Sequence, residues 1–342
     1  MFFELVVISF LFTLFVIPVF RPIAVKLNLI DYPTDRKKHD APVPFIGGLC
    51  IFMGLLVTQF FLWEFNKEIV TILFSSLLIL ILGIWDDIVN LKPKFKLLVQ
   101  FFIVTLTIYI TDIKVETLGV LFGFTYSLDL GFFSLPFTII AIIGLTNAFN
   151  MIDGVDGLAS TLSIIAIFGI LFASFNSEGL LFNNILLAIL SGLIPFLFFN
   201  ISRYKLKVFL GDGGSLFLGF VISLGLIYNS QNINNFSPSF AIWCVAVPVY
   251  DFLTVLILRK ISRHPLLNAN RDHLHHSLEN FGISTKAIML IITSGSLGLL
   301  IIGYILEKNF SELSFSVFIF LFLLFLFFRV LTRSKDNAST YQ

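Results

Sequence analysis

The sequence predicts an all-α polytopic membrane protein that forms a single integral membrane domain over residues 1–342. Three observations lead to this fold class. Hydrophobic residues make up 57% of the chain and charged residues only 13%, whereas a soluble domain carries about 25% charged residues. Apolar runs of about 20 residues, the length that spans a bilayer core, recur along the whole chain. The charged residues gather between these runs, mostly in alternate loops.

About eleven transmembrane helices are expected from the apolar runs and the polar breaks between them. They cover residues 3–20, 46–63, 68–85, 97–112, 135–149, 158–175, 180–200, 214–229, 240–258, 285–305 and 314–331. The first run has no basic segment before it and no cleavage site after it, which favours a retained helix over a signal peptide. The segment 113–134 is too polar to span, and its β-branched and aromatic alternation predicts a small extracytoplasmic hairpin.

The distribution of Lys and Arg sets the expected orientation. Of the 22 Lys and Arg residues, 19 fall in one alternate set of loops or at its edges, and the other set holds Lys67, Lys114 and Lys308. Because cytoplasmic loops carry the excess of Lys and Arg, the N-terminus is expected to be extracytoplasmic and the C-terminus cytoplasmic, in the inner (plasma) membrane. The net charge of +1 provides no basic field of the kind that binds nucleic acid.

Five polar clusters fall in the loops expected to be cytoplasmic. The first runs from Asp31 to Gly48 and includes Lys38 and His39. Its basic residues could simply meet anionic lipid heads. The two prolines and two glycines that follow constrain the backbone and allow a helix to approach closely, which indicates a shaped site.

The second cluster is a pair of adjacent carboxylates, Asp86 and Asp87, at the end of the third expected helix. Their like charges repel and also oppose the dipole of that helix. A solvated helix end would tolerate them at a small cost. A divalent cation or a cationic substrate explains them better, because Mg²⁺ takes one or two carboxylates together with substrate phosphate oxygens.

The third cluster consists of Asn147, Asn150, Asp153 and Asp156, which follow one another at intervals of three. Residues three apart share a helix face, so all four are expected to point into one cavity, while the neighbouring glycines break the helix. One aspartate could instead serve only as a helix cap. Four polar groups in register exceed what capping needs, and ionisable residues at membrane depth are candidates for function.

The fourth and fifth clusters add a glycine-rich turn and a group of histidines. The turn around Asp212 opens a helix, where backbone N–H groups bind phosphate, although an Asp cap after a glycine turn is also common. The run His273-Leu274-His275-His276 could bind zinc, but no cysteine accompanies it. The acidic residues nearby favour a hard metal, and histidines that contact a diphosphate fit as well. Asp251, within an apolar run, is expected to form structural hydrogen bonds between helices.

Carboxylates, basic residues and histidines at one membrane face suit a phosphoryl transfer in which one reactant is a lipid, because such catalysis is mostly positioning and electrostatics. The alternative from another class is a secondary transporter, in which many helices with buried acids are also expected. Transporters place such groups near the midplane and often in two repeated halves. Here no internal repeat is seen, and the acids lie at one face. A lipid-flipping or scaffold protein would not need so many convergent acids.

The clusters resemble, in the same order, the motifs of the polyprenyl-phosphate N-acetylhexosamine-1-phosphate transferases of glycosyltransferase family 4. The resemblance runs from about Asp31 to Lys286 and is carried by DRKKHDAPVPFIGG, GIWDDIVNLKPKFKLLVQ, NAFNMIDGVDGLAS, FLGDGGSLFLG and PVYDFLTVLILRKISRHPLLNANRDHLHH. It implies that a polyprenyl phosphate attacks the β-phosphorus of a UDP-sugar on the cytoplasmic side. UMP leaves, and a polyprenyl-diphospho-sugar forms.

The resemblance also implies roles for individual residues. The catalytic set comprises Asp86, Asp87, Asp153 and Asp156, the substrate-binding set Lys38, His39, Asn147, Asn150, His273, His275 and His276, and the metal set Asp212 and Asp87. The implied cofactor is Mg²⁺, with Mn²⁺ as a substitute. The implied partners are a UDP-N-acetylhexosamine, polyprenyl phosphate and membrane lipid, and a homodimer is left open.

The details of two strings favour one branch of this family. Similar muramoyl-pentapeptide transferases of the cell wall usually show Thr-Pro-Thr-Met-Gly-Gly and three consecutive histidines. Here the strings run from Val43 to Gly48 and from His273 to His276, with Leu274 interrupting the histidines. This pattern favours undecaprenyl phosphate and UDP-N-acetylglucosamine as substrates, at the start of O-antigen, enterobacterial common antigen or teichoic-acid linkage synthesis. Another UDP-N-acetylhexosamine, or UDP-MurNAc-pentapeptide, is the alternative donor.

Overall fold

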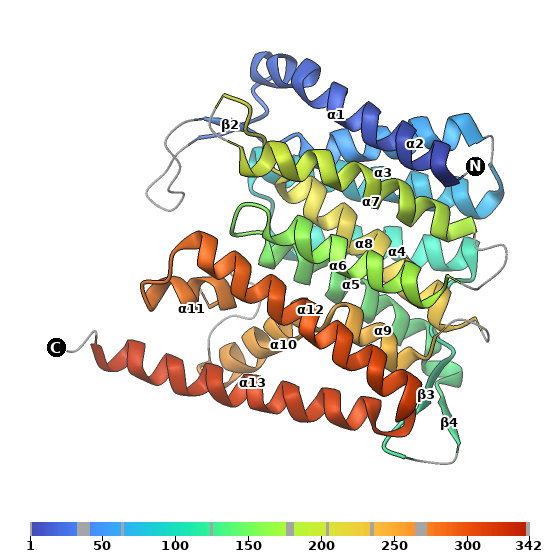
Figure 1. Cartoon of the computed structure of the whole chain (residues 1–342), viewed down its shortest axis with the longest axis vertical. Coiled ribbons are helices and arrows are strands. Elements are labelled where there is room, and N and C mark those ends of the chain that lie inside the picture. The colour runs from blue at the N-terminus through green and yellow to red at the C-terminus, as the bar shows by residue number, and fades with distance from the viewer. Residues whose placement is uncertain are drawn as a thin grey trace.

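The computed structural model describes residues 2–32, 42–62, 65–123, 126–175, 181–202, 205–232, 236–263 and 272–339. Within these ranges the chain is mainly helical, which confirms the expected class (Figure 1). The helices are α1 (Phe2–Lys26), α2 (Gly47–Leu62), α3 (Lys67–Val89), α4 (Pro93–Thr111), α5 (Ser134–Ile152), α6 (Leu158–Ala173), α7 (Leu181–Ile201), α8 (Gly211–Ser230), α9 (Pro238–Cys244), α10 (Ala246–Ile261), α11 (Leu274–Asn280), α12 (Thr285–Asn309) and α13 (Ser311–Ser339), with a 3₁₀ turn, η1 (Gly131–Phe133), before α5.

The helices fall on the apolar runs of the sequence. Within the described parts of the chain, eight helices are long and apolar enough to cross a membrane. They are α1, α3, α4, α5, α7, α8, α12 and α13. The helices α2 and α6 are apolar but shorter, with 16 residues each. Polar caps mark several starts: the side chains of Asn66, Ser237 and Ser284 accept N–H groups three residues further on, in α3, α9 and α12.

The run 240–258, expected as one helix, is two helices that meet at a sharp bend. The helix α9 ends at Cys244, α10 begins at Ala246, and the two axes differ by 84°. Pro248 accounts for the break, because a proline ring clashes with the carbonyl group four residues earlier, here that of Cys244. Val245 therefore leaves the helical conformation, with φ −125° and ψ 26°.

Two small antiparallel sheets complete the fold. The strands β3 (Thr117–Val120) and β4 (Ser127–Asp129) form the hairpin expected within 113–134. The side chain of Gln231, at the end of α8, accepts hydrogen bonds from the backbone N–H groups of Glu116 and Thr117 and so fastens the hairpin to the bundle. The pair β1 (Ile30–Asp31) and β2 (Val43–Pro44) was not expected from the sequence.

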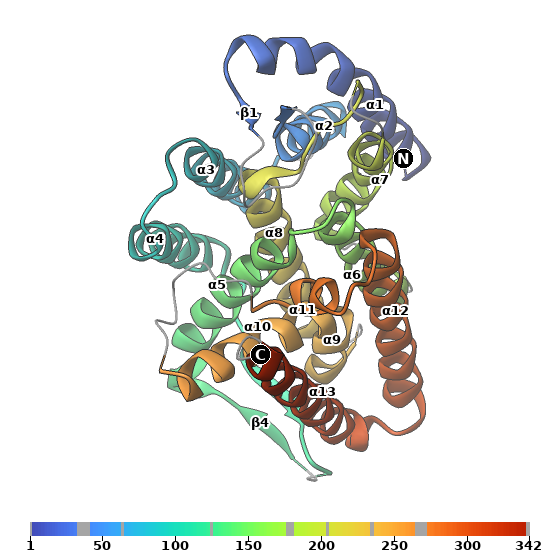
Figure 2. The ribbon, with the colours of Figure 1, turned by 90° about the vertical axis from the view of Figure 1, so that its left-hand side faces the viewer.

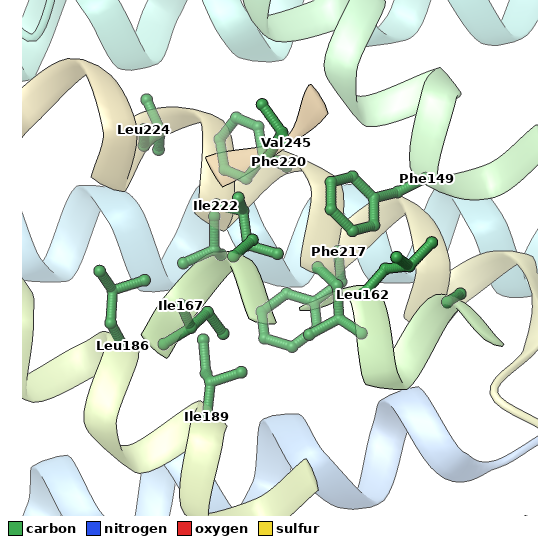
Figure 3. Close-up of a cluster of buried hydrophobic side chains, with 14 of the residues drawn as sticks. Phe149, Leu162, Ile167, Leu186, Ile189, Phe217, Phe220, Ile222, Leu224 and Val245 are labelled. Carbon is green, nitrogen blue, oxygen red and sulfur yellow. The ribbon is translucent and has the colours of Figure 1, made fainter. Parts of the chain in front are cut away.

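The helix α8 lies at the centre of the bundle, as seen along the helices in Figure 2, and packs against α3 and α5. Its side chains meet those of α5, α6 and α7 in a dry core (Figure 3). This core includes Phe149, Leu162, Ile167, Leu186, Ile189, Phe217, Phe220, Ile222 and Leu224. A helix that is apolar on all sides is buried on all sides, and this property places α8 between its neighbours.

Glycines bring the start of α8 against the backbones of α2 and α3. A Cβ atom at Gly48 would overlap the Cα atom of Gly214, and one at Gly83 would overlap that of Gly213. Only glycine permits these approaches. The first turn of α8 is thereby placed beside the last turns of α3.

The two chain ends lie at opposite ends of the bundle (Figure 1). The N-terminus lies at the end with the β3–β4 hairpin, and the described C-terminus lies at the end with β2 and α11.

Candidate active site

Carboxyl groups from two helices meet where α3 ends and α8 begins. Asp86 and Asp87 lie in the last turn of α3, and Asp212 lies in the first turn of α8. The Oδ2 atom of Asp87 is 3.4 Å from the backbone nitrogen of Gly213, and the carboxyl of Asp212 lies beside that of Asp86. The glycine contacts between α3 and α8 therefore bring the second and fourth sequence clusters together.

Lys96, in the first turn of α4, provides positive charge to this group. Its Nζ atom is 2.7 Å from Oδ2 of Asp86, 3.2 Å from Oδ1 of Asn150 and 4.0 Å from Oδ2 of Asp212. Leu91 donates its backbone N–H to Oδ1 of Asp86 at 2.8 Å. Lys96 lies within the string GIWDDIVNLKPKFKLLVQ, but it was assigned no role from the sequence. Its position one turn after Pro93, a proline at a helix start, was the available signal.

The third cluster does not lie on one helix face as expected. The helix α5 ends at Ile152, so only Asn147 and Asn150 are helical, while Asp153 caps the helix and Asp156 lies in the turn that follows. Gly157 in that turn has φ +77°, which confirms that the glycines break the helix. The turn therefore directs the two aspartates away from the helix face that carries the two asparagines.

The four members of this cluster consequently have different partners. Asn150 donates to Oγ of Ser215 at 3.0 Å and accepts from Lys96, so it joins the carboxyl group. Asn147 donates to Oε1 of Gln100 on α4 at 2.7 Å. Asp156 forms an ion pair with Lys207 in the loop before α8.

Asp153 lies close to Asp212 and Asp156. It is partly accessible to solvent but closely surrounded by protein, and this burial, followed by the charges of Asp212 and Asp156, raises its pKa to about 8. Asp153 therefore carries a proton near neutral pH and can donate a hydrogen bond, which an ionised carboxylate cannot do. We call Asp86, Asp87, Asp153 and Asp212, together with Lys96, the carboxylate centre.

The histidine cluster contacts the carboxylate centre through His275. Its ring, which is 1% exposed, lies directly against Gly154, where a Cβ atom would overlap Nε2. Burial, and then the neighbouring His276 and His273, lowers the pKa of His275 to about 3, so the ring is neutral. Neither ring nitrogen has a hydrogen-bond partner within the described residues. A polar group of a substrate would satisfy them.

The other two histidines are held by acids. The Nδ1 atom of His273 is 2.9 Å from Oδ2 of Asp251, and Nδ1 of His276 is 3.0 Å from Oε2 of Glu279. Asp251 also accepts the backbone N–H of Leu274, which confirms its expected role as a structural hydrogen-bonding group between helices. Arg329, which contacts Asp251 from α13, was missed because it belongs to an apolar run far from every motif.

The first cluster is described only at its two ends, residues 31–32 and 42–48. Lys38 and His39 lie outside the described residues. The segment that follows them, from β2 to Gly48, lies against the start of α8: the Gly47 and Gly48 N–H groups donate to the carbonyl oxygens of Phe209 and Leu210. The first cluster is thus anchored next to Asp212.

The donor set fits a magnesium ion better than a zinc ion. Within the described parts of the chain, no three or more His, Cys, Asp or Glu side chains are arranged as a metal cage. Mg²⁺ needs only one or two protein carboxylates, because water and substrate phosphates complete its shell. Asp212 and Asp87, whose carboxyl groups flank the same turn of α8, provide such a pair.

Comparison with known proteins agrees with this geometry. Residues 69–230 match the sequence profile of glycosyl transferase family 4. A probable undecaprenyl-phosphate N-acetylglucosaminyl 1-phosphate transferase of Bacillus subtilis (strain 168) is 33% identical over 288 residues, covering 84% of this chain and 79% of the relative.

Two further relatives are described as undecaprenyl-phosphate alpha-N-acetylglucosaminyl 1-phosphate transferases. The protein of Pasteurella multocida (strain Pm70) is 31% identical over 84% of this chain and 81% of its own length. That of Salmonella typhi is 28% identical over 83% of this chain and 78% of its own length. Relatives of this identity and coverage, whose alignments extend over most of the bundle, show that the chain belongs to glycosyl transferase family 4, alongside the undecaprenyl-phosphate N-acetylglucosaminyl 1-phosphate transferases.

Proposed function

We propose that the protein transfers N-acetylglucosamine 1-phosphate from UDP-N-acetylglucosamine to undecaprenyl phosphate, giving undecaprenyl-diphospho-N-acetylglucosamine and UMP. The observation that carries the proposal is the meeting of Asp86, Asp87 and Asp212 with Lys96 at one end of the bundle. The names of the relatives supply the acceptor and the transferred group. The family resemblance supplies the UDP donor, and another UDP-N-acetylhexosamine is the alternative.

In this reaction a phosphate oxygen of undecaprenyl phosphate attacks the β-phosphorus of the nucleotide sugar. The new bond joins that oxygen to phosphorus, and the bond from the β-phosphorus to the bridging oxygen breaks, so the bridging oxygen leaves with UMP. A phosphate monoester is already largely ionised near pH 7, since its second pKa is about 6. Asp86 or Asp87 can accept the remaining proton where one is present. The two carboxylates therefore act mainly through their negative charge, which attracts the ammonium group of Lys96 and would attract Mg²⁺.

The remaining residues bind and orient the phosphates. Lys96 and the backbone N–H groups that open α8 stabilise negative charge on the phosphate oxygens. Asp153, protonated near neutral pH, donates a hydrogen bond to a substrate oxygen. Neutral His275 donates its single ring N–H to an oxygen of the diphosphate. Mg²⁺, with Mn²⁺ as a substitute, would be held by Asp212 and Asp87, and when bound it would offset the charge of the diphosphate and polarise the phosphoryl oxygens.

We place this site at the cytoplasmic face of the inner membrane, with eleven crossings, the N-terminus outside and the C-terminus inside. The positions of the chain ends at opposite ends of the bundle support an odd number of crossings (Figure 1). The loops that hold most of the Lys and Arg residues belong to the same set as the carboxylate centre, which supports the cytoplasmic side. A soluble nucleotide sugar and a lipid phosphate can meet there.

The test uses the full chain purified in detergent, with undecaprenyl phosphate, radiolabelled UDP-N-acetylglucosamine and Mg²⁺. We expect equal amounts of UMP and lipid-linked sugar, loss of both on adding EDTA, and recovery with excess Mg²⁺. Parallel reactions with other UDP-N-acetylhexosamines and UDP-MurNAc-pentapeptide identify the donor. Protein that releases no UMP with any of these donors would contradict the proposed function, and full activity in EDTA would contradict the metal.

A further inference from the structure

Buried side chains from α10 and α13 surround His273, which lies just before α11. Asp251 on α10 and Arg329 on α13 are each 2% exposed, and His273, just before α11, is 6% exposed. The carboxylate of Asp251 receives three contacts: Nδ1 of His273 at 2.9 Å, the backbone N–H of Leu274 at 2.8 Å and Nη1 of Arg329 at 3.4 Å. We call Asp251, His273 and Arg329 the histidine network.

The network holds the backbone of His273 as well as its ring. Arg329 donates through Nη2 to the carbonyl oxygen of Asp272, the residue before His273, while Asp251 accepts the N–H of Leu274, the residue after it. His273 is therefore fixed on both sides along the chain. The segment that carries it has little freedom to rotate, because each side of the segment is tied to a different long helix.

The ring contact decides which nitrogen is left for chemistry. When Asp251 accepts a hydrogen bond from Nδ1, the proton on Nδ1 is fixed and Nε2 is the nitrogen that can meet another group. The rings of His273 and His275 lie nearly parallel, with an interplanar angle of 8° and centroids 5.9 Å apart. His275 in turn touches Gly154, next to Asp153. The network is therefore linked to the carboxylate centre through the His275 ring and Gly154.

We propose that Asp251 and Arg329 are positioning residues that hold the ring of His273 so that its Nε2–H donates to an oxygen of the substrate diphosphate. This inference rests on the proposed function, because it needs a phosphate group at the site. Arg329 balances the charge of Asp251, which lets a carboxylate stay buried beside the histidine without an unpaired charge. The C-terminal helix thus takes part in the active site without touching the substrate.

The charges around His273 make the role measurable. Two helices bring charged groups to this segment: Asp251 and Arg259 come from α10, and Arg329 comes from α13. Along the chain, His273 is flanked by Asp272, His275 and His276. Arg259 is 3.7 Å from the carboxylate of Asp272. Arg329→Met removes a positive charge from the surroundings of the His273 ring, whereas Asp251→Asn removes a negative one. The two substitutions therefore change the charge around the ring in opposite directions.

The experiment measures kcat, KM for UDP-N-acetylglucosamine and the pH profile of kcat/KM for Arg329→Met, Arg329→Lys and Asp251→Asn. We expect kcat to fall about 10- to 100-fold in Arg329→Met and Asp251→Asn, the range typical of losing a carboxylate partner that orients a histidine. KM should stay within about threefold, and Arg329→Lys should recover part of kcat because it restores the charge. The pH profile of kcat/KM should shift upward in Arg329→Met and downward in Asp251→Asn, because the first variant loses a positive and the second a negative charge beside the site.

Tyr250→Phe is the matched control. The Tyr250 hydroxyl donates to the carbonyl oxygen of Phe318 at 2.7 Å, so it also links α10 to α13 and lies next to Asp251 in sequence. Its loss should lower the melting temperature and leave kcat and the pH profile unchanged. If Asp251→Asn does not fold, the two Arg329 variants carry the test alone.

The outcomes separate this inference from the proposed function. Wild-type protein that makes no lipid-linked sugar contradicts the function itself. Active wild-type protein whose Arg329→Met variant keeps both kcat and the pH profile contradicts the positioning role only. A loss of activity that is equal at every pH and follows the melting temperature also contradicts it, because that pattern indicates a structural role.

Discussion

The carboxylate centre and the histidine network lie at the same end of the bundle, but they differ in how their charges are balanced. In the carboxylate centre, Asp86 and Asp212 face the ammonium group of Lys96, while Asp87 lies against Gly213 and Asp153 lies close to Asp212. In the histidine network, the carboxylate of Asp251 meets the guanidinium of Arg329, a histidine ring and a backbone N–H. The first region carries surplus negative charge, and the second satisfies its own charges.

This difference indicates different tasks. Crowded carboxyl groups destabilise a fold unless a cation or a proton offsets them, so a region that retains them is arranged for something that binds there. A buried carboxylate with complete hydrogen bonds instead holds neighbouring groups in one geometry. The carboxylate centre is thus suited to binding cations and phosphates, and the histidine network to orienting the side chain beside them.

The largest expected effect is loss of turnover without loss of stability in the carboxylate centre. Asp87→Asn and Asp212→Asn should each lower kcat at least about a hundredfold, the scale of removing a central electrostatic group. Their melting temperatures in EDTA should stay the same or rise, because one like charge is removed. The measurements are the radiolabelled transfer assay and thermal unfolding in detergent.

Asp112→Asn is the control for this pair, since the Asp112 side chain is 80% exposed beside Lys114 at the hairpin end of the bundle. It should leave turnover within about twofold of wild type, as surface substitutions usually do. Near-normal turnover in Asp87→Asn or Asp212→Asn would remove that residue from the centre. A clear drop in melting temperature would instead assign it a structural role.

The second prediction concerns the contact that joins the two regions. In Gly154→Ala the new Cβ atom would overlap Nε2 of His275 and displace the histidine from the Asp153 turn. We expect turnover to fall about tenfold or more, since small misplacements of positioned groups are costly. Gly144→Ala on α5 is the control, because its Cβ atom would meet Phe252 at an ordinary 3.7 Å. Equal turnover in the two variants would show that the contact does not couple the regions.

The third prediction uses the pKa of Asp153, which burial raises to about 8. A carboxyl whose pKa is raised on folding binds its proton more tightly in the folded state, so its contribution to stability declines as pH rises from about 4 through about 8. In EDTA, the melting temperature of wild type should fall across this range more steeply than that of Asp153→Asn. Parallel pH dependences in the two proteins would contradict the raised pKa.

The smallest expected effect is that of Lys207→Met, which breaks the ion pair with Asp156 at the edge of the centre. The Asp156 side chain is 43% exposed, and exposed ion pairs contribute about 0–1 kcal/mol. The free energy of unfolding in detergent should therefore change by no more than about 1 kcal/mol. A much larger loss would place this pair among the buried, balanced groups and would weaken the contrast between the two regions.

Much of the fold could be read from hydrophobic runs, because a segment that crosses a bilayer core must satisfy its backbone internally as a helix. The β3–β4 hairpin was also predictable, since 113–134 lacks an apolar run. The break between α9 and α10 was not predicted, although Pro248 was visible, because a proline can either kink a helix or end it and the neighbouring helices decide which. The four polar residues from Asn147 to Asp156 were expected to share one helix face, but α5 ends at Ile152, because the glycines of the following turn break the helix.

The candidate site was predictable in its motifs but not in its contacts. Asp86, Asp87 and Asp212 stood out because carboxylates are costly in an apolar chain, and the structure brings them together. Lys96 was part of a motif string but was not assigned a role. Arg329 carried no signal at all, because an arginine near the end of an apolar helix usually reaches the membrane interface.

By itself the sequence determined the helical class, the positions of the apolar segments and the kinds of polar group available at one end. Those properties follow from side-chain polarity and segment length, which are local. Only the tertiary structure decided which charges are paired, which carboxyl keeps its proton and which ring nitrogen of His273 is left for a substrate. Those properties depend on distances between helices far apart in the chain, because the strength of each charge interaction is set by separation and burial.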